Sequence, residues 1–206
     1  MILEQEIKLA IMSEQVLDLS VLPIVGYQRS SIETMHLVST YFDTPSFNLA
    51  KQGLGLRLRF DGKNWLQTVK DKGQIDNGLH QRQEWEHSLP GKAFDLALLN
   101  QTPLHELIDD EPLWASLSPI FTTEFDRQYC LLETGEQTTI ELAYDRGRVY
   151  TVTLEAPIHE VELELKSGQL HYLTALAQEL CLTEPLQASN CSKAQQGYEL
   201  VPKYNH

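Results

Sequence analysis

Charged and apolar side chains alternate at the start of this chain, and this alternation constrains the fold more than any other feature. Glu4, Glu6 and Lys8 occupy every second position and alternate with a mainly apolar set. Successive side chains of a β-strand point to opposite faces, so a period of two places these charges on one face. The pattern returns near the other end of the chain at Glu160 and Glu162. Each segment is predicted to be a strand that carries a row of acids, whether solvated or enclosed.

The same alternation recurs along most of the chain. Asp61-Gly62 is a hairpin signal between two alternating segments. Strands joined mostly by hairpins form antiparallel sheets, and about eight of them can close into a barrel. The strands that we expect are residues 1–9, 27–43, 54–60, 65–72, 80–89, 120–134, 138–144 and 151–166. Helical segments are expected at 13–22, 44–53, 93–117 and 169–182, and the pattern leaves 190–200 undecided.

Each of the central strands combines one apolar face with one charged face. Arg57 and Arg59 share a face, Lys70 lies on the charged face of the next strand, and Arg82 and Glu84 lie together on a later one. Two structures fit this pattern. In the first, the sheet packs on helices and its charged face lies in water, which is the common arrangement. In the second, a closed barrel turns its apolar residues outward against helices and its charges line the interior.

The distribution of the charges favours the barrel. Solvated faces usually mix Ser, Thr, Asn and Gln with scattered charges, whereas these faces are concentrated in Arg, Lys and Glu. Acids lie near both ends of the chain and bases lie in the middle strands. Carboxylates suit Mg²⁺, Mn²⁺ or Ca²⁺, and guanidiniums bind phosphate. These are the groups that phosphoryl chemistry needs together.

Composition excludes several classes of protein. The chain has 206 residues and a net charge of −13, which argues against a general nucleic-acid surface. Three widely spaced cysteines indicate neither a disulfide framework nor a zinc site. Early charges exclude an apolar signal peptide, and no apolar run is long enough to span a membrane. We therefore expect one cytoplasmic domain, residues 1–206, that does not act on membranes.

The order of short motifs resembles that of the CYTH superfamily, the triphosphate tunnel metalloenzymes. No single motif is specific, but the ordered set covers nearly the whole chain. Within the superfamily, the chain looks most like the bacterial inorganic triphosphatases. The motifs that carry the resemblance are Glu4-x-Glu6-x-Lys8, Tyr41-Phe-Asp43-Thr-Pro, Gly-Leu-Arg57-Leu-Arg59, Trp-Leu-Gln-Thr-Val-Lys70, Gly-Leu-His-Gln-Arg82, Glu84-x-Glu86, Arg127, Asp145, Glu160-x-Glu162 and Ser-Lys193-Ala-x-x-Gly-Tyr.

The resemblance implies an α+β fold, in which an eight-stranded antiparallel β-barrel encloses a charged tunnel and helices pack outside. It also implies hydrolysis of inorganic tripolyphosphate with Mg²⁺ or Mn²⁺ as cofactor. Lys8 and Tyr41 resemble a pair that helps water to attack. The metal ligands implied are Glu4, Glu6, Asp145, Glu160 and Glu162, and the triphosphate-binding residues implied are Arg57, Arg59, Lys70, Arg82, Arg127 and Lys193.

Several residues have a structural alternative to a functional role. Glu84 and Glu86 are expected to orient arginines by ion pairs rather than to bind metal. Glu164 has the right alternation but aligns less well with the family pattern, and Asp43 before Thr-Pro fits a turn cap. The seven histidines show no paired metal-ligand spacing, so we assign none of them a role.

Two other classes of function remain open. One is a different reaction on the same scaffold, either adenylate cyclase or nucleoside or thiamine triphosphatase. The other is a non-catalytic polyphosphate-binding module. We see no nucleobase pocket in the sequence, and the chain keeps both acids and bases, whereas a binder needs only the bases. Tripolyphosphatase is therefore the leading hypothesis.

Overall fold

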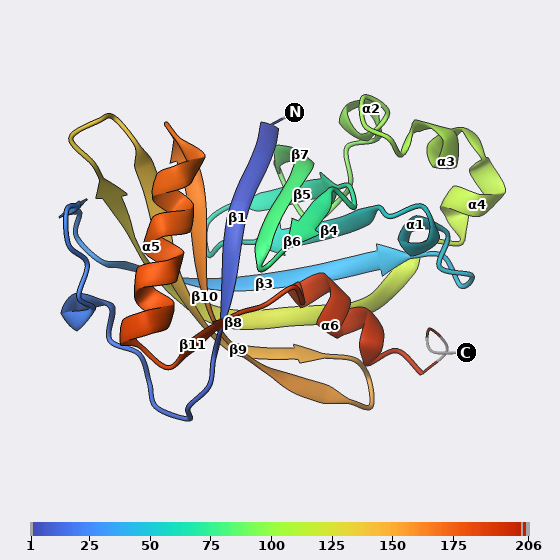
Figure 1. The fold of residues 1–206 in the computed structure, drawn as a ribbon. Helices are drawn as coiled ribbons and strands as arrows, with labels where there is room; N and C mark the ends of the chain where they lie inside the picture. Colours follow the sequence, from blue (N-terminus) through green and yellow to red (C-terminus); the bar gives the residue numbers. More distant parts are fainter. Residues whose placement is uncertain (1, 203, 205–206) are drawn as a thin grey trace.

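The computed structural model describes residues 2–202 and 204, and its centre is a closed ring of long strands (Figure 1). The ring follows the order β1-β10-β9-β8-β3-β4-β5-β7, every neighbouring pair is antiparallel, and pairing of β7 with β1 closes it. Its eight strands are β1 (Ile2–Ile11), β3 (Glu33–Asp43), β4 (Gly55–Phe60), β5 (Trp65–Lys70), β7 (Leu79–Leu89), β8 (Ser118–Glu133), β9 (Thr139–Tyr150) and β10 (Glu155–Ser167). The expected eight-stranded antiparallel barrel is confirmed.

Strand β1 closes the ring because it pairs on both edges. Lys8 lies opposite Glu162 of β10, and Glu4 lies opposite Arg82 of β7. Closure leaves no long unpaired edge in the ring, which protects a sheet from edge-to-edge association. Three short strands extend the ring: β2 (Gln28–Arg29) pairs with β8, β6 (Gln74–Asp76) with β7, and β11 (Leu186–Ala188) with β1.

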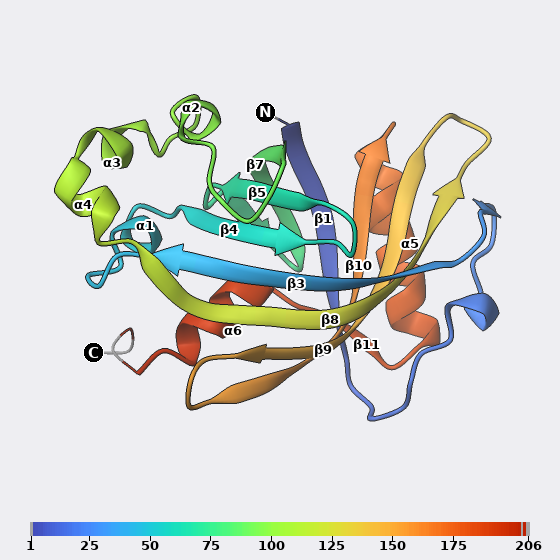
Figure 2. The ribbon, with the colours of Figure 1, turned by 180° about the vertical axis from the view of Figure 1, so that it is seen from behind.

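Most of the helices pack outside the ring of strands, whereas the last helix, α6, borders the central cavity (Figures 1 and 2). The longest helix, α5, buries Leu173, Leu176 and Leu180 against Leu9 and Leu163 on the outer faces of β1 and β10. The helices within the described residues are α1 (Asn48–Lys51), α2 (Leu96–Leu99), α3 (His105–Asp109), α4 (Glu111–Ala115), α5 (Leu170–Thr183) and α6 (Lys193–Glu199), with a 3₁₀ turn at Leu19–Val21. None of these is long and apolar enough to span a membrane.

Two smaller apolar clusters hold the remaining helices. Leu56 and Val69, on the outer faces of β4 and β5, pack with Leu99 of α2 and Leu107 of α3. Helix α6 packs through Tyr198 against Phe121 and its neighbours on β8. The outward faces of β1, β4, β5 and β10 thus carry apolar residues against helices, whereas Phe121 shares a face of β8 with Arg127 and stacks on Tyr41 at the cavity. Outward apolar faces are the arrangement that the alternation predicted for a barrel with a charged interior.

The helix expected at residues 13–22 is wrong, because only the 3₁₀ turn at Leu19–Val21 forms there. The Asp18 carboxylate accepts a hydrogen bond from the Ser20 amide at 2.8 Å and caps this short turn. The Arg29 guanidinium donates to the carbonyl oxygens of Leu19, Ser20 and Leu22. These carbonyls are therefore bound by the Arg29 side chain rather than by the amides of a helical turn.

The bounds of three other elements also differ from expectation. The strand predicted over 27–43 is interrupted between β2 and β3, and the undecided tail, residues 190–200, contains α6. Strand β11 forms just before this tail, where no strand was expected. Strand β9 continues through Gly147 to Tyr150, beyond the end that was expected at residue 144. A Cβ atom at Gly147 would lie 2.2 Å from the Glu124 carbonyl oxygen. The glycine therefore permits close approach to β8, and Arg146 and Arg148 belong to the strand. The first strand was predicted to begin at Met1, which lies outside the described residues.

Candidate active site

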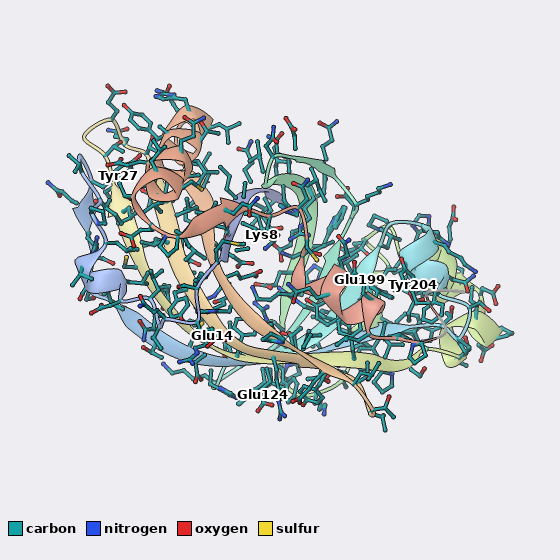
Figure 3. All side chains as sticks on the ribbon, turned by 60° about the horizontal axis from the view of Figure 1, so that its bottom comes forward. Lys8, Glu14, Tyr27, Glu124, Glu199 and Tyr204 are labelled. Carbon is teal, nitrogen blue, oxygen red and sulfur yellow. The ribbon has the colours of Figure 1, made fainter. Side chains whose placement is uncertain are left out.

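The barrel encloses a cavity of about 840 Å³ that is lined by charged side chains from strands around the ring and from α6. In Figure 3, Lys8 lies inside the ring of strands, whereas Glu124 projects from its outer surface. Most of the residues that the resemblance implied line this cavity: Glu4, Glu6, Lys8, Tyr41, Arg57, Arg59, Lys70, Arg82, Arg127, Glu162 and Lys193. The other two, Asp145 and Glu160, are buried and lie outside the lining as the structure describes it.

Three of the predicted metal ligands come together in one cluster, which we call the acid triad: Asp145, Glu160 and Glu162. One ligand oxygen from each lies within 4.8 Å of the others. The register explains the convergence, because Asp145 of β9 lies directly opposite Glu160 of β10, and Glu162 is the next residue on the same face. Three buried carboxylates fit the donor chemistry of a hard divalent cation such as Mg²⁺ or Mn²⁺.

Buried cations neutralise the acid triad. The Lys193 Nζ atom lies 2.6 Å from Asp145 Oδ2 and 2.9 Å from Glu162 Oε1, and it also contacts Glu160. The Arg127 guanidinium binds both oxygens of Asp145 at 2.7 Å and contacts Glu162 as well. Charge-assisted contacts of this kind keep buried carboxylates ionised.

The pKa values within the triad diverge. Burial would raise the pKa of Glu162, but Lys193, Lys8 and Arg127 hold it well below its ordinary value. Arg127 and Lys193 lower the pKa of Asp145 in the same way. Burial dominates at Glu160, whose pKa is raised although Lys193 opposes the shift. The triad therefore combines two firmly ionised carboxylates with one that holds a proton more readily.

Glu4 and Glu6 lie beside the triad rather than in it. Arg82 binds Glu4 through Nε at 2.7 Å and also contacts Glu6, while Lys70 lies 2.6 Å from Glu4. Lys70 and Arg82 lower the pKa of Glu4 far below its ordinary value against the effect of burial. Lys8 joins the two acidic groups, since its Nζ atom contacts both Glu6, at 3.1 Å, and Glu162.

The wall formed by β3, β4 and β5 is basic. Arg57 lies 3.7 Å from both Glu84 and Glu86, as expected for glutamates that orient an arginine. Arg59 donates from Nε to the Ser39 hydroxyl at 2.9 Å and makes no ion pair among the described residues. Burial, together with the positive charge of Arg57, lowers the pKa of Arg59 to about 10. Arg59 is therefore a partly buried cation with no ion-pair partner in the part of the chain that the structure describes.

The predicted water-positioning pair spans the cavity. Lys8 is on β1 and Tyr41 is on β3, and these strands lie four places apart in the ring. Lys8 is bound by acids, whereas the Tyr41 hydroxyl accepts a long hydrogen bond of 3.5 Å from Arg57. Burial would raise the pKa of Tyr41, but Arg57 and Arg59 lower it. The two side chains therefore face the cavity from opposite walls.

Sequence reasoning missed several residues around the cavity. Glu141 lines it and lies 3.5 Å from Arg127. Its position four residues before Asp145 on the same strand face was the signal that could have found it. Asp43 caps the turn before α1, as expected, but it also accepts a hydrogen bond from Tyr198 of α6 at 2.9 Å. No local pattern connects residues so distant in the sequence.

His80 is a further buried residue that received no role from the sequence. It continues the charged face of β7 toward one end of the barrel, opposite Glu6 in register, and is 1% exposed. Its Nε2 atom lies 3.3 Å from the Ser189 carbonyl oxygen. Burial and the nearby Lys8 ammonium lower its pKa, which favours the neutral ring.

Known structures share this fold. A proposed adenylyl cyclase from Hippeastrum, described as having a dominant triphosphatase activity, aligns with a TM-score of 0.60 at 19% identity, over 98% of this chain and 99% of that one. A proposed adenylate cyclase from Bacillus halodurans aligns with a TM-score of 0.53 at 21% identity, over 93% of this chain and 96% of that one. At these identities the likeness concerns the fold alone.

Sequence comparison is more specific. A curated inorganic triphosphatase from Haemophilus influenzae is 35% identical over 204 residues, which are 98% of this chain and 56% of the relative. The chain thus spans about half the length of that relative. The family model of the CYTH domain matches residues 3–198, from the first acidic strand to the end of α6. Together with the barrel and its charged cavity, this match shows that the chain belongs to the CYTH family.

Proposed function

We propose that this chain catalyses the metal-dependent hydrolysis of inorganic tripolyphosphate to diphosphate and phosphate inside the barrel. The observation that carries the proposal is the pairing of opposite chemistries in one cavity. The acid triad fits a divalent cation, and Arg59 faces the same cavity as a partly buried guanidinium without an ion-pair partner among the described residues. The name of the Haemophilus relative supports the same activity.

The residues divide into metal-binding and phosphate-binding groups. The acid triad, with Glu4 and Glu6 beside it, would hold Mg²⁺ or Mn²⁺. A bound divalent cation shields phosphate oxygens from the carboxylates and polarises them toward attack. The phosphate-binding residues are the cavity cations Arg57, Arg59, Lys70, Arg82, Arg127 and Lys193. Lys8 and Tyr41 would orient the attacking water from opposite walls.

Catalysis in this cavity needs no covalent nucleophile. Phosphoryl transfer depends mainly on position and on electrostatic stabilisation of the charge that develops. Arginine suits the task because its guanidinium remains charged and binds phosphate oxygens in pairs. Burial strengthens these contacts, because water screens them less.

Substrate and metal must replace the ion pairs that now fill the cavity. Arg82 and Lys70 are held by Glu4, and Arg127 is held by Asp145. A triphosphate alone would take the bases and leave the carboxylates without partners, which is costly in a buried site. A divalent cation supplies the missing positive charge. Turnover is therefore expected to depend strictly on the metal.

The first test is release of phosphate from tripolyphosphate with Mg²⁺, with Mn²⁺ and with a chelator. We expect release with either ion and none above background with the chelator. Glu162→Gln, which removes charge but keeps shape, is the matched inactive control. Equal rates with and without metal, or a normal rate in this variant at saturating Mg²⁺, would contradict the proposal. Binding without turnover in the wild-type protein would identify a polyphosphate-binding module instead.

Substrate choice follows from the side chains that face the cavity. Trp85 packs with the external cluster around Leu56, and the Trp65 ring lies against Phe60. Neither tryptophan lines the cavity as described. The aromatic residues in the lining are Tyr41, Tyr198 and Tyr204, and the rings of Tyr41 and Tyr198 already pack on Phe121. We therefore expect a base to add little, and kcat/KM for tripolyphosphate to exceed that for ATP by about tenfold, or roughly 1.4 kcal/mol. Initial rates on tripolyphosphate, ATP and thiamine triphosphate under one metal condition test this. Faster hydrolysis of ATP, or cyclic AMP as product, favours the alternative reaction.

A further inference from the structure

The Lys193 ammonium lies where the acid triad would hold a metal ion. Its Nζ atom contacts all three carboxylates of the cluster, with distances of 2.6 Å to Asp145 and 2.9 Å to Glu162. The oxygens that converge on this ammonium are therefore those suited to a divalent cation. Because two cations cannot share such a position, the lysine and the metal must compete for it.

The exposure of the triad shows what Lys193 covers. Glu162 and Lys193 line the cavity, whereas Asp145 is 0% exposed and Glu160 is 5% exposed. A cation that arrives through the cavity meets the ammonium before it reaches these two acids. Lys193 thus stands between the cavity and the deeper part of the triad.

Two other cations touch the triad, but their geometry is different. Arg127 binds both oxygens of Asp145 and also contacts Glu162, but it makes no bond to Glu160 within residues 2–202 and 204. Lys8 binds Glu162 and Glu6. Within the described chain, Lys193 is the one cation that bridges all three carboxylates.

The backbone under Lys193 is anchored, but its side chain is long and flexible. The Ser192 hydroxyl accepts a hydrogen bond from the Gln195 amide at 3.1 Å and caps α6. At the other end of α6, Tyr198 binds Asp43. The lysine side chain has a flexible four-carbon stem, so it can redirect its ammonium while the helix stays in place. Since Lys193 already borders the cavity, such a movement brings the charge to a bound phosphate.

We propose that Lys193 is an exchangeable internal cation: it neutralises Asp145, Glu160 and Glu162 before metal arrives, and metal binding releases its ammonium into the cavity, where it binds the triphosphate. The last step rests on the function proposed above, and the release step does not. Metal binding and substrate binding are coupled in this way, because metal binding frees the Lys193 ammonium, and the freed ammonium then binds the phosphate groups of the substrate.

Titration with Mn²⁺ in the absence of any phosphate tests the competition. Lys193→Met removes the competing charge and should bind Mn²⁺ about tenfold more tightly than wild type, as measured by calorimetry. Arg59→Met is the matched control, because it removes a cavity cation that contacts no described carboxylate. Its affinity for Mn²⁺ should rise much less. Lys193→Arg keeps the charge and serves as a second control. Circular dichroism checks that any loss of Mn²⁺ binding in the methionine variant is not caused by misfolding.

The outcome is decided by the comparison of the two methionine variants. Tighter Mn²⁺ binding in Lys193→Met than in Arg59→Met supports the exchange. Equal affinities, weaker binding in the Lys193 variant, or no binding of Mn²⁺ to any variant would overturn it. These results do not depend on hydrolysis.

Chemical labelling follows the released ammonium directly. Acetic anhydride and mass spectrometry give the acetylation rate of Lys193 relative to that of Lys63, an exposed lysine of the β4–β5 turn. We expect a low ratio in chelator, a several-fold rise with Mn²⁺ alone, and a fall again when a non-hydrolysable imido analogue of tripolyphosphate is added. A ratio that Mn²⁺ leaves unchanged refutes the release. A rise with Mn²⁺ in a protein that hydrolyses nothing would preserve the release and refute the proposed function.

Discussion

Arg59 shows at the scale of one residue how a binding site can weaken the fold that contains it. Its guanidinium is largely buried and lies near Arg57 and Arg127, and these neighbours add to the effect of burial on its pKa. A base whose pKa falls in the folded state is less stable there in its charged form. Because Arg59 is charged at neutral pH in both the folded and the unfolded chain, the full cost is present under ordinary conditions.

Replacing Arg59 should therefore separate stability from activity. We expect Arg59→Gln to raise the free energy of unfolding by roughly 1–3 kcal/mol and to lower kcat/KM by a factor equivalent to about 1.5–3 kcal/mol. Arg57→Gln is the contrasting variant, because it leaves Glu84 and Glu86 without their arginine, and we expect it to lose both stability and activity. Urea unfolding and steady-state kinetics measure the two effects. A destabilised but fully active Arg59→Gln would mean that the side chain only supports the fold.

His80 should make stability depend on pH. Its folded pKa lies below the ordinary value of 6.5, so the unfolded chain binds a proton more readily than the native one. The stabilisation from the neutral ring is complete above about pH 6.5 and decreases as pH falls toward the folded pKa. His80→Gln keeps a donor for the Ser189 carbonyl and cannot titrate. Urea unfolding between about pH 7.5 and 5.5 should show a shallower loss of stability in this variant than in wild type. Parallel curves for the two proteins would contradict the prediction.

The sequence predicts which face a residue occupies better than which residue it meets. The period of two placed Lys70, Arg82 and Glu162 on charged faces, because alternation is a local property of a strand. The triad itself depends on register, since Asp145 lies opposite Glu160 only when β9 and β10 pair in one alignment. For the same reason, the separation of Glu4 from the triad was not visible before the strands were placed.

At the scale of one element, α6 depends on a glycine for its position. A Cβ atom at Gly197 would lie 2.1 Å from the Phe121 ring, so the helix packs on β8 at a distance that no side chain permits. This contact fixes the helix that carries Lys193 and Tyr198. A short helix with little area of its own is thereby held at the cavity by one close approach.

Gly197→Ala should displace α6 and affect both stability and turnover. We expect a loss of about 1–3 kcal/mol of unfolding free energy from overpacking, with lower kcat/KM because Lys193 moves with the helix. Gly135→Ala is the control, since a Cβ atom there meets nothing within 4 Å, and it should change stability by less than about 0.5 kcal/mol. Thermal unfolding and initial rates measure the result. Equal behaviour of the two alanine variants would show that α6 accommodates the methyl group.

Elements were predictable where one local signal decided them. Hairpin β4–β5 and helix α5 formed as expected, because Asp61-Gly62 and an amphipathic segment are sufficient signals. The segment 13–22 has helix-compatible residues, but the contacts of Arg29 with its carbonyls override that preference. Strand β9 runs past its expected end at residue 144, because Gly147 permits a close approach to β8 that becomes visible only when the two strands are paired.

At the scale of the whole molecule, the interior is arranged so that its opposite charges neutralise one another. The acids of β1, β9 and β10 are matched by Lys8, Lys70, Arg82, Arg127 and Lys193. A buried carboxylate that keeps its cationic partner retains most of its stabilising contacts. The barrel therefore does not require metal in order to fold, although the proposed reaction does.

Removal of metal should accordingly abolish turnover and leave the fold intact. A chelator is expected to shift Tm by no more than about 2 °C. Mn²⁺ together with a non-hydrolysable imido analogue of tripolyphosphate, at about 100 times its Kd, should add about 2.7 kcal/mol of stability. The analogue without metal should add much less, because it leaves carboxylates without partners. Differential scanning calorimetry compares the untreated protein, the protein with chelator, the protein with the analogue alone, and the protein with Mn²⁺ and the analogue. Unfolding on addition of the chelator would show that metal is part of the fold.

The closure of the ring by β1 sets the order in which the molecule is assembled. Lys8 meets Glu162 across 154 positions of sequence, so the first strand leaves the ribosome long before its partner on β10 exists. Contacts between such distant residues make folding slow, because the entropy of closing a long loop is lost before the pairing is gained. Until β10 is made, the charges of β1 remain in water and discourage wrong partners at its open edge. The ring therefore cannot close around its cavity until β10 has been made.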